Sequence, residues 1–216
     1  MPALCSLLAG AETDWKRPPF EIRELLRDEL PAAVVLLARA MRDDPMYEAV
    51  FGPSADHRFA RLNRFYGGLL PVMGRGLLSA WDAGRLVGVL GSFPLGSCKA
   101  SLALQLWIAY RMLSVDLAEL WRLWHWQSNS EIHAPRQRHC QLGPVAVAVD
   151  RQRQGIGSRM LQAFCARMDN RGEPAFLETD KWDSVRFYQR FGFEVTARAE
   201  ILGKRNWWMR RPGRQA

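Results

Sequence analysis

The amino-acid sequence predicts one domain of mixed α/β structure, and three observations support this fold class. Runs in which apolar residues alternate with period two are interleaved along the chain with runs of period 3.6, so strands and helices follow one another. The 216 residues suffice for one substantial core, and no internal Pro/Gly/Ser-rich linker divides them. Hydrophobic residues make up 48% and charged residues 24%, which is ordinary for a globular domain.

The N-terminal part predicts an arm, a strand and a helix. Residues 1–19 have no sustained period and end in two prolines, so we expect a flexible arm at 1–19 and the folded domain at 20–216. Residues 20–25 alternate well enough for a strand. Pro31 then opens an apolar run that predicts a helix, and this helix should stop before Pro45.

The next stretch predicts a second helix and a hairpin. Residues 55–70 place apolar side chains three and four positions apart, with basic residues between them, and predict an amphipathic helix that ends at Pro71. Strand-like runs follow at 76–81 and 85–93. They are separated by Asp82-Ala83-Gly84, a strong turn signal, so we expect them to pair antiparallel.

A tryptophan-rich stretch at 99–130 is the unusual part of the chain. Its apolar residues at helical spacing over 99–127 predict one or two helices, inserted into the α/β pattern. Two interpretations remain open. Aromatic residues at this spacing commonly pack into a core. Alternatively, they form a lid over a substrate pocket, in which case Trp121 and Trp124 would affect the binding of an apolar or aromatic substrate.

The remaining third of the chain again alternates strands with helices. Its best-supported helix follows Gly155, because apolar residues down to Met168 share one face and Gly172 follows where a terminator is expected. The expected elements are strand 141–149, helix 155–168, strand 175–179, helix 184–191 and strands 193–199 and 206–209.

Charge and cysteine content narrow the functional classes only slightly. A net charge of +8 suits nucleic acid, an anionic membrane surface or a phosphorylated ligand, and charge alone does not choose among them. The four cysteines are scattered without a C-x-x-C pair, as is typical of a reducing compartment. No apolar run approaches the roughly 18 residues of a membrane span, and no basic segment leads the chain as in a secretory signal. We therefore expect a soluble, cytoplasmic protein.

The segment with the clearest chemical meaning is a basic loop with two glycines. Gln152-Arg153-Gln154-Gly155-Ile156-Gly157-Ser158 follows a strand-like run and opens a helix. Glycines let backbone N–H groups approach a ligand, and a helix N-terminus adds unpaired donors and partial positive charge, so the loop suits a pyrophosphate. A glycine pair here also occurs in plain tight turns, and the spacing alone leaves both interpretations open. The loop lacks the Gly-Lys-Ser/Thr of a Walker loop and the third glycine of a dinucleotide fingerprint.

This loop and a second motif resemble the GCN5-related N-acetyltransferases, the GNAT family. The family's cofactor loop reads Q/R-x-x-G-x-G/A after a strand, and Gln152 to Gly157 fit it. Phe187 to Phe193 look like the family's F-Y-x-x-x-G-F, about 30 residues downstream. The sequence departs from the family pattern where Val149 replaces a frequent proline, and where Lys181 and Ser184 replace frequent asparagines.

The resemblance implies a fold, a cofactor and residues that bind it. The fold would be a mixed sheet of about seven strands with helices on both faces, and the helical insertion at 99–130 would lie between strands 3 and 4. The cofactor would be acetyl-CoA or another acyl-CoA, with no metal. The backbone of Val145 and Val147 would pair with the pantetheine arm, and Arg153 to Ser158 would hold the pyrophosphate. The full set of cofactor-binding candidates is Val145, Val147, Gln152, Arg153, Gln154, Gly155, Ile156, Gly157 and Ser158.

The resemblance also implies catalytic candidates and a reaction. Tyr188 would be the general acid that protonates the departing thiolate, although a packed core tyrosine is the alternative. Glu178 would act as general base or orient a water, with a structural ion pair as its alternative. The protein would transfer an acetyl group directly to an amine of a small molecule or peptide, within a ternary complex.

Other functional classes stay in view. The substitutions at Lys181 and Ser184 leave room for a regulatory module that binds acyl-CoA without chemistry. A nucleic-acid-binding domain is a further alternative, but the arginines are dispersed, so we expect no nucleic acid and no membrane as partner. The histidines lack the spacing of a metal site. The acceptor, the acyl chain length and the choice between monomer and homodimer are left open.

Overall fold

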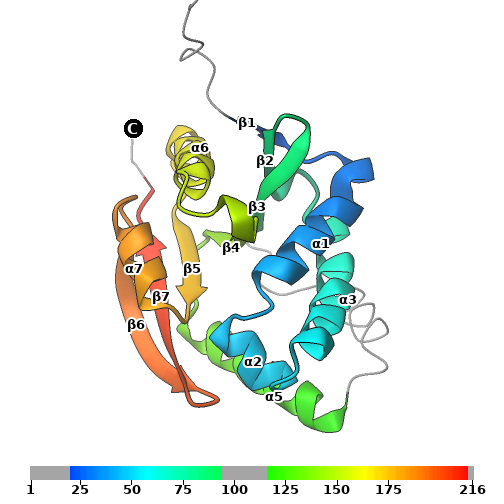
Figure 1. Cartoon of the computed structure of the whole chain (residues 1–216). Helices are drawn as coiled ribbons and strands as arrows, with labels where there is room; N and C mark the ends of the chain where they lie inside the picture. The colour runs from blue at the N-terminus through cyan, green and yellow to red at the C-terminus, as the bar shows by residue number, and fades with distance from the viewer. Residues whose placement is uncertain (1–19, 94–115, 214–216) are drawn as a thin grey trace, which may run out of the picture.

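The computed structural model describes residues 20–93 and 116–213 (Figure 1). The expected arm at 1–19 and the first part of the insertion, up to residue 115, lie outside the described residues. Within the described part of the chain, none of the helices is both long and apolar enough to cross a membrane.

A seven-stranded mixed sheet forms the middle of the molecule, as predicted. Its strand order is β1-β2-β3-β4-β5-β7-β6. Every neighbouring pair is antiparallel except β4 and β5, which run parallel. The strands are β1 (Glu21–Glu24), β2 (Leu77–Asp82), β3 (Arg85–Phe93), β4 (Cys140–Val147), β5 (Ala175–Thr179), β6 (Glu194–Ile201) and β7 (Lys204–Arg211).

Helices cover both faces of this sheet, and each face has its own hydrophobic core. One core packs α1 (Leu30–Ala40), α2 (Pro45–Phe51) and α3 (Ala55–Met73) against the sheet. The other packs α6 (Ile156–Arg171) and α7 (Trp182–Gln189) against the opposite face. In Figure 1, α1 and α3 accordingly lie to one side of β4 and β5, and α6 and α7 lie to the other.

Both two-residue hairpin turns require left-handed backbone. The β2–β3 turn uses Ala83 and Gly84, at φ 47° and 79°, and the β6–β7 turn uses Leu202 and Gly203, at φ 52° and 73°. Positive φ at both central residues matches the twist of antiparallel strands. The predicted β2–β3 hairpin is therefore confirmed, and β6 and β7 are longer than their sequence patterns indicated.

Two helix predictions need correction. The helix expected to end at Pro71 continues to Met73, with the proline inside its last turns. Pro71 has no N–H to donate to the carbonyl four residues earlier, and the helix ends two residues later. The helix α2 was not predicted, although Asp44-Pro45 is a recognisable helix start. Asp44 accepts a hydrogen bond from the Met46 N–H, and Pro45 occupies the first turn.

The parallel strands β4 and β5 separate soon after they begin. They pair only at Cys140 with Ala175 and at Gln141 with Phe176. Beyond these residues β4 stays paired with β3, and β5 stays paired with β7. The sheet therefore opens between β4 and β5, and a ligand can reach both faces of the sheet there.

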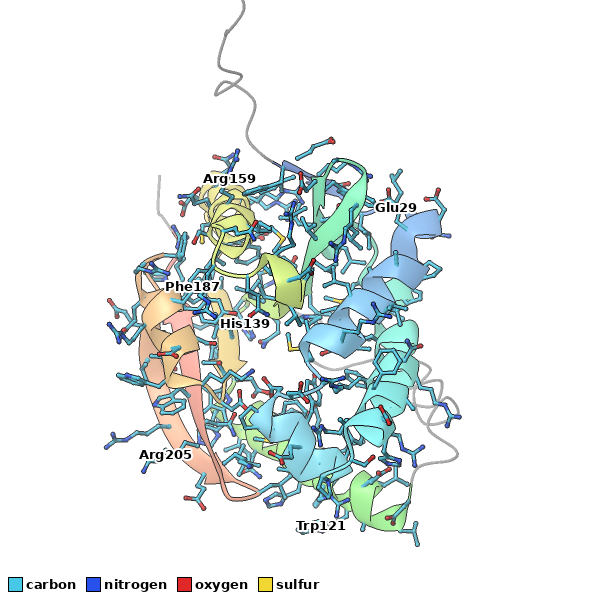
Figure 2. All side chains as sticks on the ribbon, in the orientation of Figure 1. Glu29, Trp121, His139, Arg159, Phe187 and Arg205 are labelled. Carbon is cyan, nitrogen blue, oxygen red and sulfur yellow. The ribbon has the colours of Figure 1, made fainter. Side chains whose placement is uncertain are left out.

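Only part of the tryptophan-rich insertion lies beside this opening. Its described part is α5 (Leu117–His133), between β3 and β4, and it extends past the predicted end at residue 130. Trp121 and Trp124 are 57% and 65% exposed, and Figure 2 shows Trp121 at the outer end of the molecule. Neither of the two interpretations therefore holds for Trp121 and Trp124, which are not packed into a core and do not line the cavity described below. Trp126, two residues after Trp124, is partly buried and lines the cavity described below.

Candidate active site

The glycine loop presents its backbone to solvent at the start of α6. Residues Gln152 to Gly155 are exposed, and Arg153 and Gly155 have φ of 62° and 83°. In the part of the chain that the structure describes, no side chain makes a capping hydrogen bond to this helix N-terminus. The first N–H groups of α6 are therefore left without an intrahelical or side-chain partner, and these are the donors that an anionic group uses.

The edge of β4 that faces β5 offers further backbone groups. The Ala148 N–H donates to the Val87 carbonyl at 2.9 Å, so Ala148 and, by the alternation of a strand, Ala146 turn their backbone groups toward β3. Val145 and Val147 consequently turn theirs toward the side where β5 has diverged. Backbone groups with this orientation could pair with an extended pantetheine arm, which is the role that the family resemblance predicts for Val145 and Val147.

The loop, β4 and α7 meet at Gly157. A Cβ atom built on Gly157 would lie 3.6 Å from Cγ2 of Val147 and 3.7 Å from Cζ of Phe187. Figure 2 shows Phe187 on the side of α7 that faces the middle of the molecule. The two sequence motifs, about 30 residues apart in the chain, are therefore brought into contact at the start of the opening between β4 and β5.

A cavity of about 310 Å³ occupies the opening in the sheet. It is lined from the α6–α7 side by Ser184 and Tyr188, and from the opposite side by residues of α2, α3 and α5. Glu178, from β5, lines the same cavity. The structure thus brings the two predicted catalytic residues to one cavity from different cores. Tyr188 packs with the core under α6 and α7. Glu178 is the cross-strand neighbour of Trp208, which belongs to the core under α1, α2 and α3.

Tyr188 is held by aromatic neighbours, and its hydroxyl is available to a ligand. Its ring packs edge-on against Phe187 and Phe193, with ring centres 5.3 and 5.8 Å away. Among the described residues, its hydroxyl makes no hydrogen bond. Burial raises the pKa of Tyr188 above that of a free tyrosine. The phenol therefore stays protonated at neutral pH and can act as a proton donor, which is the role that the sequence predicted.

Glu178 is a buried carboxyl group in a setting that opposes its charge. Burial raises the pKa of Glu178, and the Ser130 hydroxyl, which donates to Oε2 at 2.5 Å, partly offsets the effect. The indole N–H groups of Trp126 and Trp208 also lower this pKa, although neither makes a hydrogen bond of normal geometry. A carboxylate with a raised pKa is a stronger base than an exposed one, which suits it to accept a proton from an ammonium group.

A pair of carboxyl groups at the end of β5, Asp44 and Asp180, was not predicted from the sequence. Asp180 accepts a hydrogen bond from the Met46 N–H at 2.8 Å, and the Lys181 ammonium lies 2.7 Å from Asp44. Burial and the nearby Asp44 raise the pKa of Asp180 to about 6. The sequence marks Asp44 only as the start of a helix, because proline follows it. Its proximity to Asp180 depends on the fold, since the two residues are far apart in the chain.

Neither an acyl-enzyme on Cys140 nor a metal centre has geometric support among the described residues of this site. Cys140 is 3% exposed and its thiol donates to the Phe93 carbonyl at 3.0 Å, and it does not line the cavity. Among residues 20–93 and 116–213, no group of three His, Cys, Asp or Glu side chains is arranged to hold a metal ion.

Comparison with known proteins gives the same fold. One solved structure, of histone acetyltransferase HPA2 and related acetyltransferase from Corynebacterium glutamicum, is 18% identical, with a TM-score of 0.68 over 92% of this chain and 99% of that one. The polyamine N-acetyltransferase of Drosophila melanogaster is 14% identical, with a TM-score of 0.64 over 89% and 99% of the two chains. The Salmonella typhimurium protein yncA, solved with its cofactor acetyl-CoA, is 14% identical, with a TM-score of 0.56 over 92% and 96%.

The sequence itself also matches a described family. Residues 40–193 match the acetyltransferase (GNAT) family. This range contains the glycine loop, the opening between β4 and β5, and the Phe187–Phe193 motif. Because the match covers more than half of the chain and the strand order and helix layers agree with it, this protein belongs to the GNAT acetyltransferase family.

Proposed function

We propose that this protein transfers the acetyl group of acetyl-CoA directly to an amine. The observation that carries the proposal is the cavity between β4 and β5, which contains a proton donor from one face of the sheet and a base from the other. Two substrates can therefore approach from opposite faces and meet without a covalent enzyme intermediate.

The residues around the glycine loop fit a CoA ester. Gly155 to Ser158 offer unpaired N–H groups to a pyrophosphate, and the cationic side chain of Arg153 stands beside them. Val145 and Val147 offer backbone groups to an amide-bearing arm. When bound, acetyl-CoA supplies the acetyl group as a thioester.

The proton movements are assigned to two residues of this chain. Glu178 accepts a proton from the incoming ammonium group, which frees the nitrogen lone pair for attack on the thioester carbonyl carbon. The carbon–sulfur bond then breaks, and Tyr188 donates its proton to the thiolate. The second proton lost by the nitrogen restores Tyr188, so the products are an amide, free CoA and one proton released through Glu178.

Titration calorimetry with acetyl-CoA, followed by a thiol-release assay with primary amines, tests this proposal. We expect micromolar binding of acetyl-CoA and amine-dependent release of CoA. Binding without release for any amine would favour a regulatory acyl-CoA-binding module. Absence of binding would remove the acyltransferase proposal altogether.

A further inference from the structure

The side of the cavity that faces away from α6 and α7 has a distinct chemical character. Its charged groups are the carboxyls of Asp44, Glu178 and Asp180, and the single ammonium group that lines it, Lys181, is paired with Asp44 at 2.7 Å. The chain as a whole carries +8, so this local excess of carboxyl groups runs against the overall charge. An acidic lining favours a cationic ligand.

A buried amide group in the same lining has an Nδ2 atom without a hydrogen-bond partner among the described residues. Asn206 is 2% exposed, lines the cavity, and its Nδ2 atom makes no hydrogen bond to any described residue. The Nδ2 group is a hydrogen-bond donor, so any ligand partner it takes is an acceptor such as a carbonyl oxygen and not an ammonium group. The last pair between β5 and β7 is Thr179 with Trp207. Continuing the same register by one residue places Asn206 opposite Asp180. The unpaired amide and the carboxyl groups therefore belong to one end of the cavity.

The remainder of this side is apolar and aromatic. Tyr47 and Tyr66 share a hydrogen bond at 2.8 Å between their hydroxyls, and the Tyr47 ring packs edge-on against Trp126 at 5.4 Å. Met41, Phe65, Leu69 and Phe93 complete the wall. A second ammonium group placed among these side chains would lose its hydration without a partner, which is strongly unfavourable.

We propose that the acceptor is a small monocationic amine with a compact aromatic or apolar body, such as an arylalkylamine. Its ammonium group lies between the carboxyl groups of Glu178 and Asp180, and its apolar body packs on Tyr47, Tyr66 and Trp126. This inference rests on the proposed acetyl transfer and narrows its substrate. Polyamines fit poorly because their second charge meets the apolar wall, and peptides fit poorly because about 310 Å³ accommodates only a compact group.

The first test is a comparison of acceptors at pH 8, where the Asp180 carboxyl is ionised. Thiol release is measured with 2-phenylethylamine, spermidine and a hexapeptide with a free N-terminus. We expect kcat/KM for 2-phenylethylamine to exceed both others by about 30-fold or more. Acetyl transfer that prefers spermidine or the peptide would overturn the substrate class while leaving the proposed function intact. Failure to bind acetyl-CoA would instead overturn the function.

The second test separates recognition of charge from catalysis. Trimethyl(2-phenylethyl)ammonium keeps the cation and ring but cannot accept an acetyl group, whereas 2-phenylethanol keeps the shape without the charge. We expect the cation to inhibit competitively against the amine at least about 10-fold more strongly than the alcohol. Equal inhibition by both compounds would overturn the cation subsite.

Two variants assign this preference to the named residues. Asp180→Asn keeps an oxygen for the Met46 N–H but loses the charge, and it should weaken inhibition by the trimethylammonium compound about 10-fold without changing the affinity for acetyl-CoA. Asn206→Leu removes a hydrogen-bond donor, which cannot pair with a cation, so it should leave inhibition by the trimethylammonium compound unchanged. Glu200→Gln, on the exposed face of β6, is the matched control and should change neither value. Unchanged inhibition in Asp180→Asn would contradict the assignment.

Discussion

The two sides of the opening between β4 and β5 are built in different ways. The side toward α6 presents backbone N–H groups from one continuous stretch, Val145 to Ser158. The side toward α2 and α5 presents side chains from α2, α3, α5, β5 and β7, brought together by the fold. The first arrangement suits a ligand that is the same in every reaction, and the second suits a ligand that differs between relatives. Substitutions on the two sides should therefore have separable effects.

The largest expected effect comes from the glycine loop. The double variant Gly155→Glu, Gly157→Glu forces a side chain at φ 83°, fills the contact between Val147 and Phe187, and places negative charge where the pyrophosphate would lie. We expect activity to fall more than about 100-fold through loss of acetyl-CoA affinity.

Gly203→Glu is the control for this double variant. It adds the same side chain at φ 73° in the β6–β7 turn, where nothing lies within 4 Å of the new Cβ. It should bind acetyl-CoA normally. Retained binding in the double variant would mean that the loop is only a tight turn.

The next effect concerns the proton donor at the centre of the opening. Tyr188→Phe keeps the ring packing against Phe187 and Phe193 and removes only the hydroxyl. We expect kcat to fall about 100-fold while the dissociation constant for acetyl-CoA stays unchanged, measured by thiol release and calorimetry. A normal kcat would show that Tyr188 is a packing residue.

Glu178→Gln should lower activity and raise stability together. Removing the base should reduce kcat/KM by about 10- to 100-fold. The pKa of Glu178 is raised in the folded protein, so its ionised form opposes folding once the pH exceeds the unfolded value. The variant should therefore melt about 2–4 °C higher than wild type at pH 7.5, with the difference vanishing near pH 4. An equal gain in melting temperature at both pH values would contradict this electrostatic explanation.

The smallest effect separates two tryptophans of α5. Trp126→Ala removes part of the cavity wall and should raise the KM for the amine about 10-fold, with no change in acetyl-CoA affinity. Trp121→Ala alters an exposed side chain and should leave both values unchanged. If Trp121→Ala also raised the amine KM, the acceptor side of the opening would extend beyond the cavity described.

The same contrast explains how far the sequence could predict this molecule. The loop at Gln152–Ser158 could be recognised from the sequence because its glycines, its basic residues and the helix that it begins are contiguous. Val145 and Val147 precede this loop directly in the chain, so the same local pattern includes them, and their binding of a pantetheine arm stays a prediction. Asp180 and Asn206 could not be found from spacing, because the carboxyl and amide groups meet only when β5 and β7 pair and α2 packs beneath them.

The tryptophan-rich insertion shows the limit of periodicity. Helical spacing predicted α5 correctly but did not indicate which side of the helix meets the protein. That choice depends on long-range contacts, since Arg61 and His57 of α3 hold Glu119 at 3.0 and 2.5 Å, and the ring of His133 stacks on Trp208 at 3.8 Å. These contacts turn Trp126 inward and leave Trp121 outside.

Hydrogen–deuterium exchange with and without acetyl-CoA tests most directly whether the two sides of the opening serve two different ligands. Acetyl-CoA should slow exchange in the segment 145–158, where β4 and the start of α6 offer free N–H groups, and should leave α5 at 117–133 unchanged. A 2-phenylethylamine analogue added afterwards should slow exchange in α2 and α5. Protection of 117–133 by acetyl-CoA, with 145–158 unaffected, would contradict this assignment of the two sides.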